Sequence, residues 1–279
     1  MKKTILLFTI VLSIFSFSVS AQLTPQPSST ETITQGFGLG KIMLTYSRPN
    51  VKGRKIFGYV EPYGQVWRTG ANSATVLKFS DDVSIEGHKV AAGEYGLFSI
   101  PGADKWTIIL SKKPNQWGAY TYNPADDYLR FDIKPGKLQD KVETLTMQFA
   151  DVMPTSGQLN ITWEHTALTL HLTCDIDARV VARIDSAMQT AKKPYYDAVI
   201  YYWNNNKDMN KALVWAEELQ KVPGFPPYVV KLWKARVLLK KGNKAAAIAT
   251  ANEGVKAAEA GKSDEYIRLN KEVIAEAGK

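Results

Sequence analysis

Cysteine, histidine and long apolar runs are scarce in this chain, and each shortage limits what the protein can be. The 279 residues include one cysteine, Cys174, and three histidines. A single cysteine cannot form an internal disulfide, so we expect packing alone to hold the fold together. After residue 21, no apolar run is long enough to span a bilayer as a helix. The His-Glu-x-x-His and Gly-x-Ser-x-Gly motifs are also missing, which argues against the common zinc peptidases and serine hydrolases.

The first 21 residues have the pattern of a secretory signal peptide. Two lysines precede an apolar run over residues 5–17, and Ala21 supplies the small residue that signal peptidase requires before the cut. We expect cleavage after Ala21, a periplasmic or secreted location, and no membrane span after cleavage. An uncleaved anchor is the alternative, but the apolar run is short for a membrane span. Residues 22–30 are rich in Pro, Ser and Thr and predict a flexible lead-in.

Hydrophobic periodicity divides the remaining chain into two halves. Over residues 31–177 apolar side chains alternate with polar ones, and turn-forming pairs separate about nine or ten short strands. This pattern predicts an antiparallel β-sandwich or a jelly-roll-like domain. Over residues 178–279 the period changes to about 3.6 and alanine becomes frequent, which predicts a small domain of α-helical hairpins. The fold class is therefore expected to be α+β.

The expected elements can be given as ranges. Strands are predicted over residues 41–46, 74–79, 83–85, 95–100, 106–110, 128–133, 142–149, 159–163 and 168–173. Helices are predicted over residues 179–191, 195–204, 209–221, 227–240, 244–260 and 264–277. The glycine-rich stretch 36–41 mimics a phosphate-binding loop, but it leads into a strand pattern and so predicts a glycine-relaxed strand or a hairpin.

The helical half contains a weak internal repeat. A shift of 33 residues, from Pro194 to Pro227, also aligns Ala216 with Ala249. This spacing resembles tetratricopeptide repeats, whose stacked hairpins present a concave surface to a peptide or protein. A helical packing module without a ligand is the alternative. Residues 179–279 carry 18 basic and 11 acidic side chains, but these are scattered, so we expect a solvated surface and no nucleic-acid partner.

The densest motif lies over residues 46–75, YSRPNVKGRKIFGYVEPYGQVWRTGANSAT. Two further motifs follow, AGEYGLF over 92–98 and QWGAY over 116–120. Together these motifs, across roughly residues 25–175, resemble an exported bacterial family catalogued as domain of unknown function 2911. The resemblance implies export and a mostly β domain, and it implies no activity. The helical half resembles an extension that some relatives carry.

Basic and aromatic residues gather in the first of these motifs. Six basic residues lie from Lys41 to Arg68 with one acid, Glu61, while residues 22–178 as a whole carry 15 basic and 16 acidic side chains. Arginine binds carboxylates or phosphates through paired hydrogen bonds, and aromatic rings stack on sugars or cations. The pattern predicts a pocket for a small anionic or glycan ligand. The candidate residues are Arg48, Lys52, Arg54, Trp67, Arg68 and Asn72.

A structural role for the same residues is the alternative. Arg48 would then bind backbone carbonyls, Trp67 would fill the core, and Arg68 would pair with Glu61 or Glu94. The stretch 116–120 is expected to form either an opposite wall of the pocket or a packed β-corner.

We expect a binding or scaffolding protein of the periplasm, with a ligand on the β loops and a protein or peptide on the helices. One alternative is a hydrolase or isomerase that uses the segment 48–72, with Glu61 or Glu94 as base. The other is a purely structural envelope protein. No catalytic residue, cofactor or metal is assigned, because the spacing of the histidines matches no strong ligand pattern. The histidines at 165 and 171 are expected to flank a hairpin.

Overall fold

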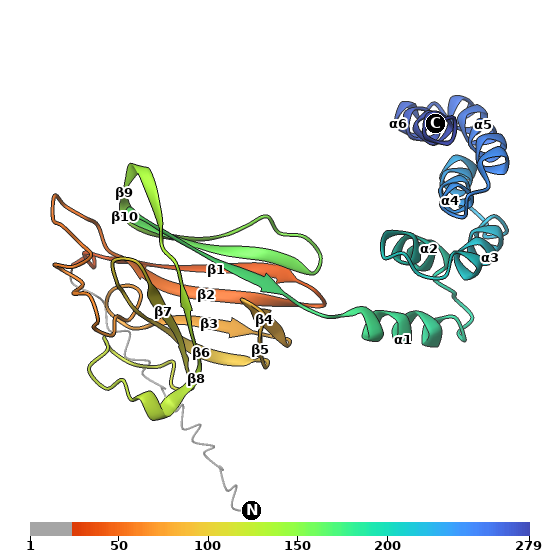
Figure 1. Cartoon of the computed structure of the whole chain (residues 1–279). Helices are drawn as coiled ribbons and strands as arrows, with labels where there is room; N and C mark the ends of the chain where they lie inside the picture. The colour runs from red at the N-terminus through yellow and green to blue at the C-terminus, as the bar shows by residue number, and fades with distance from the viewer. Residues whose placement is uncertain (1–23) are drawn as a thin grey trace, which may run out of the picture. The chain divides into compact units, whose positions relative to one another are not determined.

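The computed structural model describes residues 24–279, and the predicted signal peptide over residues 1–21 lies outside them. The chain divides after Asp175 into two compact units, which we call the β unit and the helical unit (Figure 1). This arrangement of two antiparallel sheets followed by helices confirms the predicted α+β class. Within the described part of the chain, no helix has both the length and the apolar character needed to cross a membrane.

Two antiparallel sheets make up the β unit. The six-stranded sheet has the order β1-β2-β3-β6-β7-β8, and the four-stranded sheet has the order β5-β4-β10-β9. The strands are β1 (Ser29–Phe37), β2 (Gly40–Arg48), β3 (Thr75–Phe79), β4 (Val83–Ile85), β5 (His88–Val90), β6 (Gly93–Ile100), β7 (Trp106–Ser111), β8 (Asp127–Ile133), β9 (Gly136–Ala150) and β10 (Ser156–Thr173).

Alternate side chains of the two sheets form one hydrophobic core. Leu44 and Tyr46 of the larger sheet are almost fully buried, as are Leu170 and Leu172 of the smaller one. This is the alternation that the sequence shows, because successive side chains of a strand point to opposite faces. The predicted antiparallel β architecture therefore follows from residues that the sequence already marks as apolar.

Three local predictions differ from the structure. Strand β1 begins at Ser29, inside the predicted lead-in, because its backbone pairs with β2 up to Arg48. The expected hairpin between the histidines is wrong, since His165 and His171 both lie on the continuous strand β10. The strand has an irregularity here instead of a turn: the register with β9 shifts on both sides of Glu164, which has a φ of 54°.

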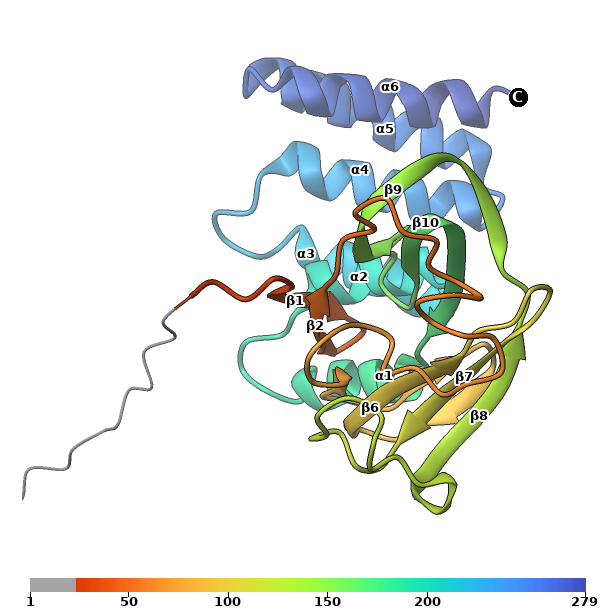
Figure 2. The same cartoon turned by 90° about the vertical axis from the view of Figure 1, so that its left-hand side faces the viewer.

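The connection between β2 and β3, residues 49–74, lies outside the assigned strands, yet the rest of the unit fixes it. We call it the connecting segment. Near its start, the backbone N–H of Val51 donates to the carbonyl of Glu143 at 2.8 Å. Near its end, Trp67 and Ser99 exchange two backbone hydrogen bonds of 2.7 and 2.9 Å. In Figure 2 this orange segment covers one end of the β unit.

Four aromatic rings anchor the connecting segment in the core. Phe57 and Trp67 come from the segment, and Trp106 and Trp163 come from the larger and the smaller sheet. The Trp67 ring stacks on Trp163 with centroids 5.8 Å apart and planes 15° apart, while Phe57 meets Trp106 edge to face at 4.7 Å. Such contacts add to the free energy that the burial of large apolar surfaces provides. We call these four residues the aromatic cluster.

Trp67→Ala is expected to destabilise the β unit by about 3–5 kcal/mol, because it opens a large cavity in the aromatic cluster. Urea unfolding monitored by circular dichroism measures the change. Tyr59→Ala is the control: Tyr59 lies on the same segment, but its side chain is 77% exposed, and we expect a change within about 0.5 kcal/mol. Equal losses for both variants would contradict the anchoring role of the cluster.

Six helices make up the helical unit. They are α1 (Asp177–Ala187), α2 (Tyr195–Asn204), α3 (Met209–Leu219), α4 (Pro227–Lys240), α5 (Lys244–Ala260) and α6 (Asp264–Ala277). Four predicted ranges are confirmed without change, and α1 and α3 end earlier than predicted. Consecutive helices from α2 to α6 pack on one another, as expected for helix hairpins.

The internal repeat holds only in part. Ala216 is buried as predicted, but its aligned residue Ala249 is exposed, and Ala251 takes the buried position. The offset arises because α4 has 14 residues whereas α2 has 10. The N-cap residues agree with this offset. Asp208 is the N-cap of α3 and Asn243 is the N-cap of α5, and each side chain accepts a backbone hydrogen bond. The expected peptide or protein partner of these helices stays a prediction.

Candidate functional site

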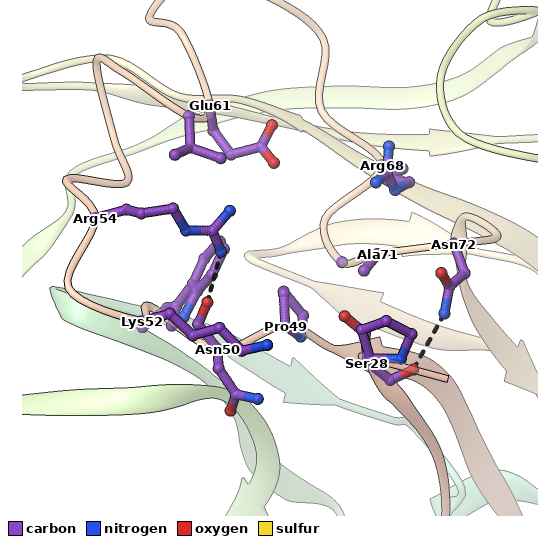
Figure 3. Close-up of a pocket in the computed structure, with 13 residues that line it drawn as sticks. Ser28, Pro49, Asn50, Lys52, Arg54, Glu61, Arg68, Ala71 and Asn72 are labelled. Atoms are coloured by element: carbon purple, nitrogen blue, oxygen red, sulfur yellow. Dashed lines mark hydrogen bonds between the residues drawn. The ribbon is translucent and has the colours of Figure 1, made fainter. Parts of the chain in front are cut away.

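A pocket of about 450 Å³ opens between the connecting segment and the start of β1 (Figure 3). Trp163 of β10 also reaches it, so the pocket borders the aromatic cluster. The lining residues are Pro27, Ser28, Pro49, Asn50, Lys52, Arg54, Val60, Glu61, Arg68, Gly70, Ala71, Asn72 and Trp163. Four of the six predicted site residues are therefore brought together: Lys52, Arg54, Arg68 and Asn72.

Three cationic side chains line this pocket without a carboxylate partner. No acidic oxygen of the described residues lies within ion-pair distance of Lys52, Arg54 or Arg68. Arg54 is held from behind, since its Nε and one Nη donate to the carbonyls of Val51 and Asn50 at 3.0 and 2.7 Å. Its remaining N–H groups stay available to a ligand. The predicted pairing of Arg68 with Glu61 or Glu94 is absent, and Glu94 pairs with Lys78 instead.

Arg68 contributes an unused hydrogen-bond donor. Its Nε is buried and has no acceptor among the described residues. A buried donor without a partner is costly in free energy, and the cost is larger for a charged group. Arg68 also lines the pocket, so the other N–H groups of its guanidinium can donate paired hydrogen bonds to the oxygens of an anion there.

Glu61 is the one carboxyl group that lines the pocket. Figure 3 shows Glu61 and Arg54 extending over the pocket from one side and Arg68 lying across from them. Burial raises the pKa of Glu61 to about 7, although the positive charges of Arg68 and Arg54 act to lower it. Near neutral pH, Glu61 is therefore only partly ionised, and the net charge of the lining is positive.

Three of the eight described non-glycine residues with a positive φ lie in or beside the pocket lining. Lys52, Thr69 and Asn72 have φ angles of 48°, 49° and 57°, in the left-handed region that disfavours side chains with a Cβ. Surrounding bonds hold these residues: the carbonyl of Thr69 accepts from the hydroxyl of Thr75 at 2.6 Å, and Asn72 donates to the carbonyl of Ser28 at 3.1 Å. Such strain is often found where a binding site must be pre-formed.

The other two predicted residues, Arg48 and Trp67, lie outside the pocket. Arg48 donates from Nε to the carbonyl of Leu145 at 3.1 Å and forms an ion pair with Glu31 at 3.3 Å. Trp67 is 3% exposed and belongs to the core. Both residues therefore have the structural role given above as the alternative: Arg48 binds a backbone carbonyl and Trp67 fills the core. Their basic and aromatic character indicated a site, but their places on β2 and in the aromatic cluster turn them away from it.

Sequence reasoning missed three parts of the pocket wall. Ser28 lies in the predicted flexible lead-in, but the side-chain amide of Asn72 donates a hydrogen bond to its carbonyl. Asn50 lies within the motif over residues 46–75 but is neither basic nor aromatic, and it accepts a hydrogen bond from Thr144 at 2.6 Å. Trp163 comes from a distant strand, and its approach depends on the packing of the two sheets, for which the sequence carries no local signal.

The histidines lie apart from one another and from this pocket. His88 stacks on Phe131 at 5.3 Å, and His171 contacts Glu86 at 2.9 Å. His165 lies within hydrogen-bond distance of the Leu138 carbonyl, at 3.2 Å. Among residues 24–279, no group of three or more His, Cys, Asp or Glu side chains is placed to hold a metal ion.

A comparison with protein families places the pocket in a known domain. The family model described as "Protein of unknown function (DUF2911)" matches residues 28–172. The chain belongs to the DUF2911 family. The DUF2911 domain extends almost from the start of β1 to the end of β10, and it contains every lining residue of the pocket except Pro27. Searches of curated proteins and of solved structures found no match.

Glu61→Gln is expected to stabilise the DUF2911 domain at pH 8 and to change it little at pH 4.5. The folded state keeps the Glu61 proton up to a pKa of about 7, whereas the unfolded chain releases it near pH 4.5. Parent stability therefore falls as the pH rises between these values, and the variant avoids this loss. Urea unfolding at the two pH values measures the difference.

The matched control for this variant is Glu94→Gln, which removes a surface carboxylate that pairs with Lys78. We expect no gain from it at pH 8, since exposed ion pairs contribute little. A Glu61→Gln variant that is less stable than the parent at pH 8 would contradict the buried, weakly ionised carboxyl described above.

Proposed function

We propose that the DUF2911 domain of this chain binds a small anionic ligand in the pocket of Lys52, Arg54, Arg68 and Asn72. The observation that supports this most strongly is the set of three cationic side chains that face one cavity without an ion pair. Elsewhere in the β unit, cations such as Lys105 and Arg130 pair with nearby aspartates. An anion with two or more oxygens fits the paired donors of arginine.

The binding test uses sulfate as the probe, since its charge does not change between pH 6 and 8. We expect Arg68→Ala to lower the affinity by roughly tenfold or more, because it removes a charge-assisted hydrogen bond worth about 1.5–3 kcal/mol. Lys52→Ala is expected to weaken binding less, and Lys55→Ala should leave the affinity within about twofold. Lys55 is the matched control because it lies on the same segment but does not line the pocket. Isothermal titration calorimetry gives all four affinities.

The pH dependence of the sulfate affinity is a second test of the site, measured by the same titration. The affinity for sulfate should rise as the pH falls from 8 to 6, because protonation of Glu61 removes the negative charge beside the anion. Glu61→Gln should bind equally well at both values. An affinity for sulfate that is the same for Arg68→Ala and the parent would contradict the proposed site. An affinity that falls with falling pH would contradict the role of Glu61.

We also propose that the chain works outside the cytoplasm, in the periplasm or secreted. The support is the sequence pattern of residues 1–21. Expression of the full chain in a Gram-negative host, followed by mass spectrometry of the periplasmic fraction, should find a protein that starts at Gln22. Recovery of the uncut chain in the cytoplasm alone would contradict this proposal.

A second candidate function is acid–base catalysis by Glu61 on the bound anion. It is favoured by the position of this carboxyl, which faces the pocket across from Arg68 without a hydrogen bond of its own (Figure 3). A group with a pKa of about 7 can both donate and accept a proton at neutral pH. A hydrolase or isomerase reaction would require that turnover of a bound substrate is lost in Glu61→Gln while binding is kept.

A further inference from the structure

Exposed aromatic side chains gather on two stretches of chain that adjoin residues lining the anion pocket. Four of the five exposed aromatic side chains in the described residues lie on two stretches of chain, residues 56–66 and 112–123. These four are Tyr59, Tyr63, Trp117 and Tyr120, with exposed fractions of 77%, 47%, 64% and 85%. Tyr59 directly precedes Val60 and Glu61, which line the pocket.

Hydrogen bonds attach the loop over residues 112–123 to the opposite wall of the pocket. The N–H of Gly118 donates to the carbonyl of the lining residue Asn72 at 3.0 Å, and Trp117 forms a backbone bridge with Ser73. Figures 1 and 2 both show this yellow-green loop beside the orange connecting segment. The motif over residues 116–120 therefore does not line the pocket, but its backbone is bonded to the lining residue Asn72 and to the next residue, Ser73.

Side-chain hydrogen bonds fasten the loop, while its aromatic rings stay exposed. Gln116 is buried, donates to the carbonyl of Lys113 at 2.8 Å and accepts from the hydroxyl of Thr121 at 3.0 Å. The ring of Tyr120 lies against Gly118, where any Cβ would come within 2.6 Å of it. An exposed Trp in a fixed loop offers a large contact surface at a small cost in conformational entropy. Nothing in the fold of the loop requires Trp117 to face solvent.

We propose that the pocket and the rim of Tyr59, Trp117 and Tyr120 together bind an acidic oligosaccharide. This inference rests on the proposed anion site, and it adds the class of ligand. The carboxylate of one sugar residue would bind Arg54 and Arg68, and the next sugar residue would lay its apolar ring face on Trp117. Hydroxyl groups of the sugar match the amides of Asn50 and Asn72 and the carboxyl of Glu61, which all line the pocket.

The surroundings favour a saccharide over a protein partner. The stretch over residues 112–123 also carries polar side chains, so its exposed rings stand among polar groups and do not form the long apolar run that is typical of protein interfaces. A linear chain of sugar rings alternates apolar faces with hydroxyl edges, and this fits separate rings in a polar rim.

The test measures oligosaccharide binding to the purified chain by calorimetry. The probes are uronic-acid oligomers of two to six residues from galacturonan, alginate and heparosan, muropeptides from peptidoglycan, and the carboxyl-reduced, neutral form of each. We expect at least one acidic oligomer to bind at least tenfold more tightly than sulfate. Carboxyl reduction and Trp117→Ala should each lower that affinity at least tenfold.

The controls separate this inference from the anion site itself. Trp117→Ala should bind sulfate like the parent, and Trp117→Phe, which keeps a flat ring, should restore most of the oligosaccharide affinity. Met153→Ala, at an exposed apolar residue outside the pocket lining and both bordering stretches, should have no effect. If every acidic oligomer binds no more tightly than sulfate, or if tight binding survives Trp117→Ala, the saccharide inference is overturned while the anion site stands. If sulfate does not bind either, the anion site is overturned with it.

Discussion

The stacking of Trp67 on Trp163 ties the connecting segment to the smaller sheet, and the other features of the site depend on that contact. The segment lies outside the assigned strands and helices, so few ladder hydrogen bonds of its own hold it. Its buried side chains Val51, Ile56 and Phe57 pack in the core instead. A stretch of chain that would otherwise be free is thus fixed at several points, and the conformational entropy lost by ordering it is offset by apolar burial.

This anchoring explains how three cations line one pocket without forming an ion pair with any described carboxylate. Repulsion between like charges, and the burial of one arginine donor, would favour a more open arrangement in a flexible loop. Here the backbone bonds around Asn50, Trp67 and Asn72 fix the positions before any ligand arrives. Because the donors are already oriented, the binding of an anion would not include the conformational entropy cost of ordering them. Glu61 limits the excess of positive charge to the degree that it is ionised.

The sequence predicts the fold better than the site, for a physical reason. Strand and helix patterns depend on neighbours in the chain, and alternation or 3.6-residue spacing reveals them directly. The site depends on contacts between distant segments. Lys52 and Arg68 could be named because charge and aromatic residues cluster locally, but Arg48 has the same local signature and is bound by the carbonyl of Leu145. What distinguishes them is the contact of Arg48, at the end of β2, with Leu145 of β9 in the other sheet.

The lining residues that the sequence did not predict also depend on contacts between distant segments. Trp163 reaches the pocket through sheet packing, and Ser28 through a side-chain bond to Asn72. The family match names the domain without an activity, so chemistry must be argued from the geometry of these residues.

The most direct test of this account is a crystal structure of the chain with selenate, an anomalously scattering analogue of sulfate. The account predicts one strong selenium peak between Arg54 and Arg68, with oxygens that accept hydrogen bonds from both guanidinium groups and the aromatic cluster unchanged. A structure without selenium in this pocket, with Arg68 instead bonded to Glu61, would contradict a pre-formed anion site.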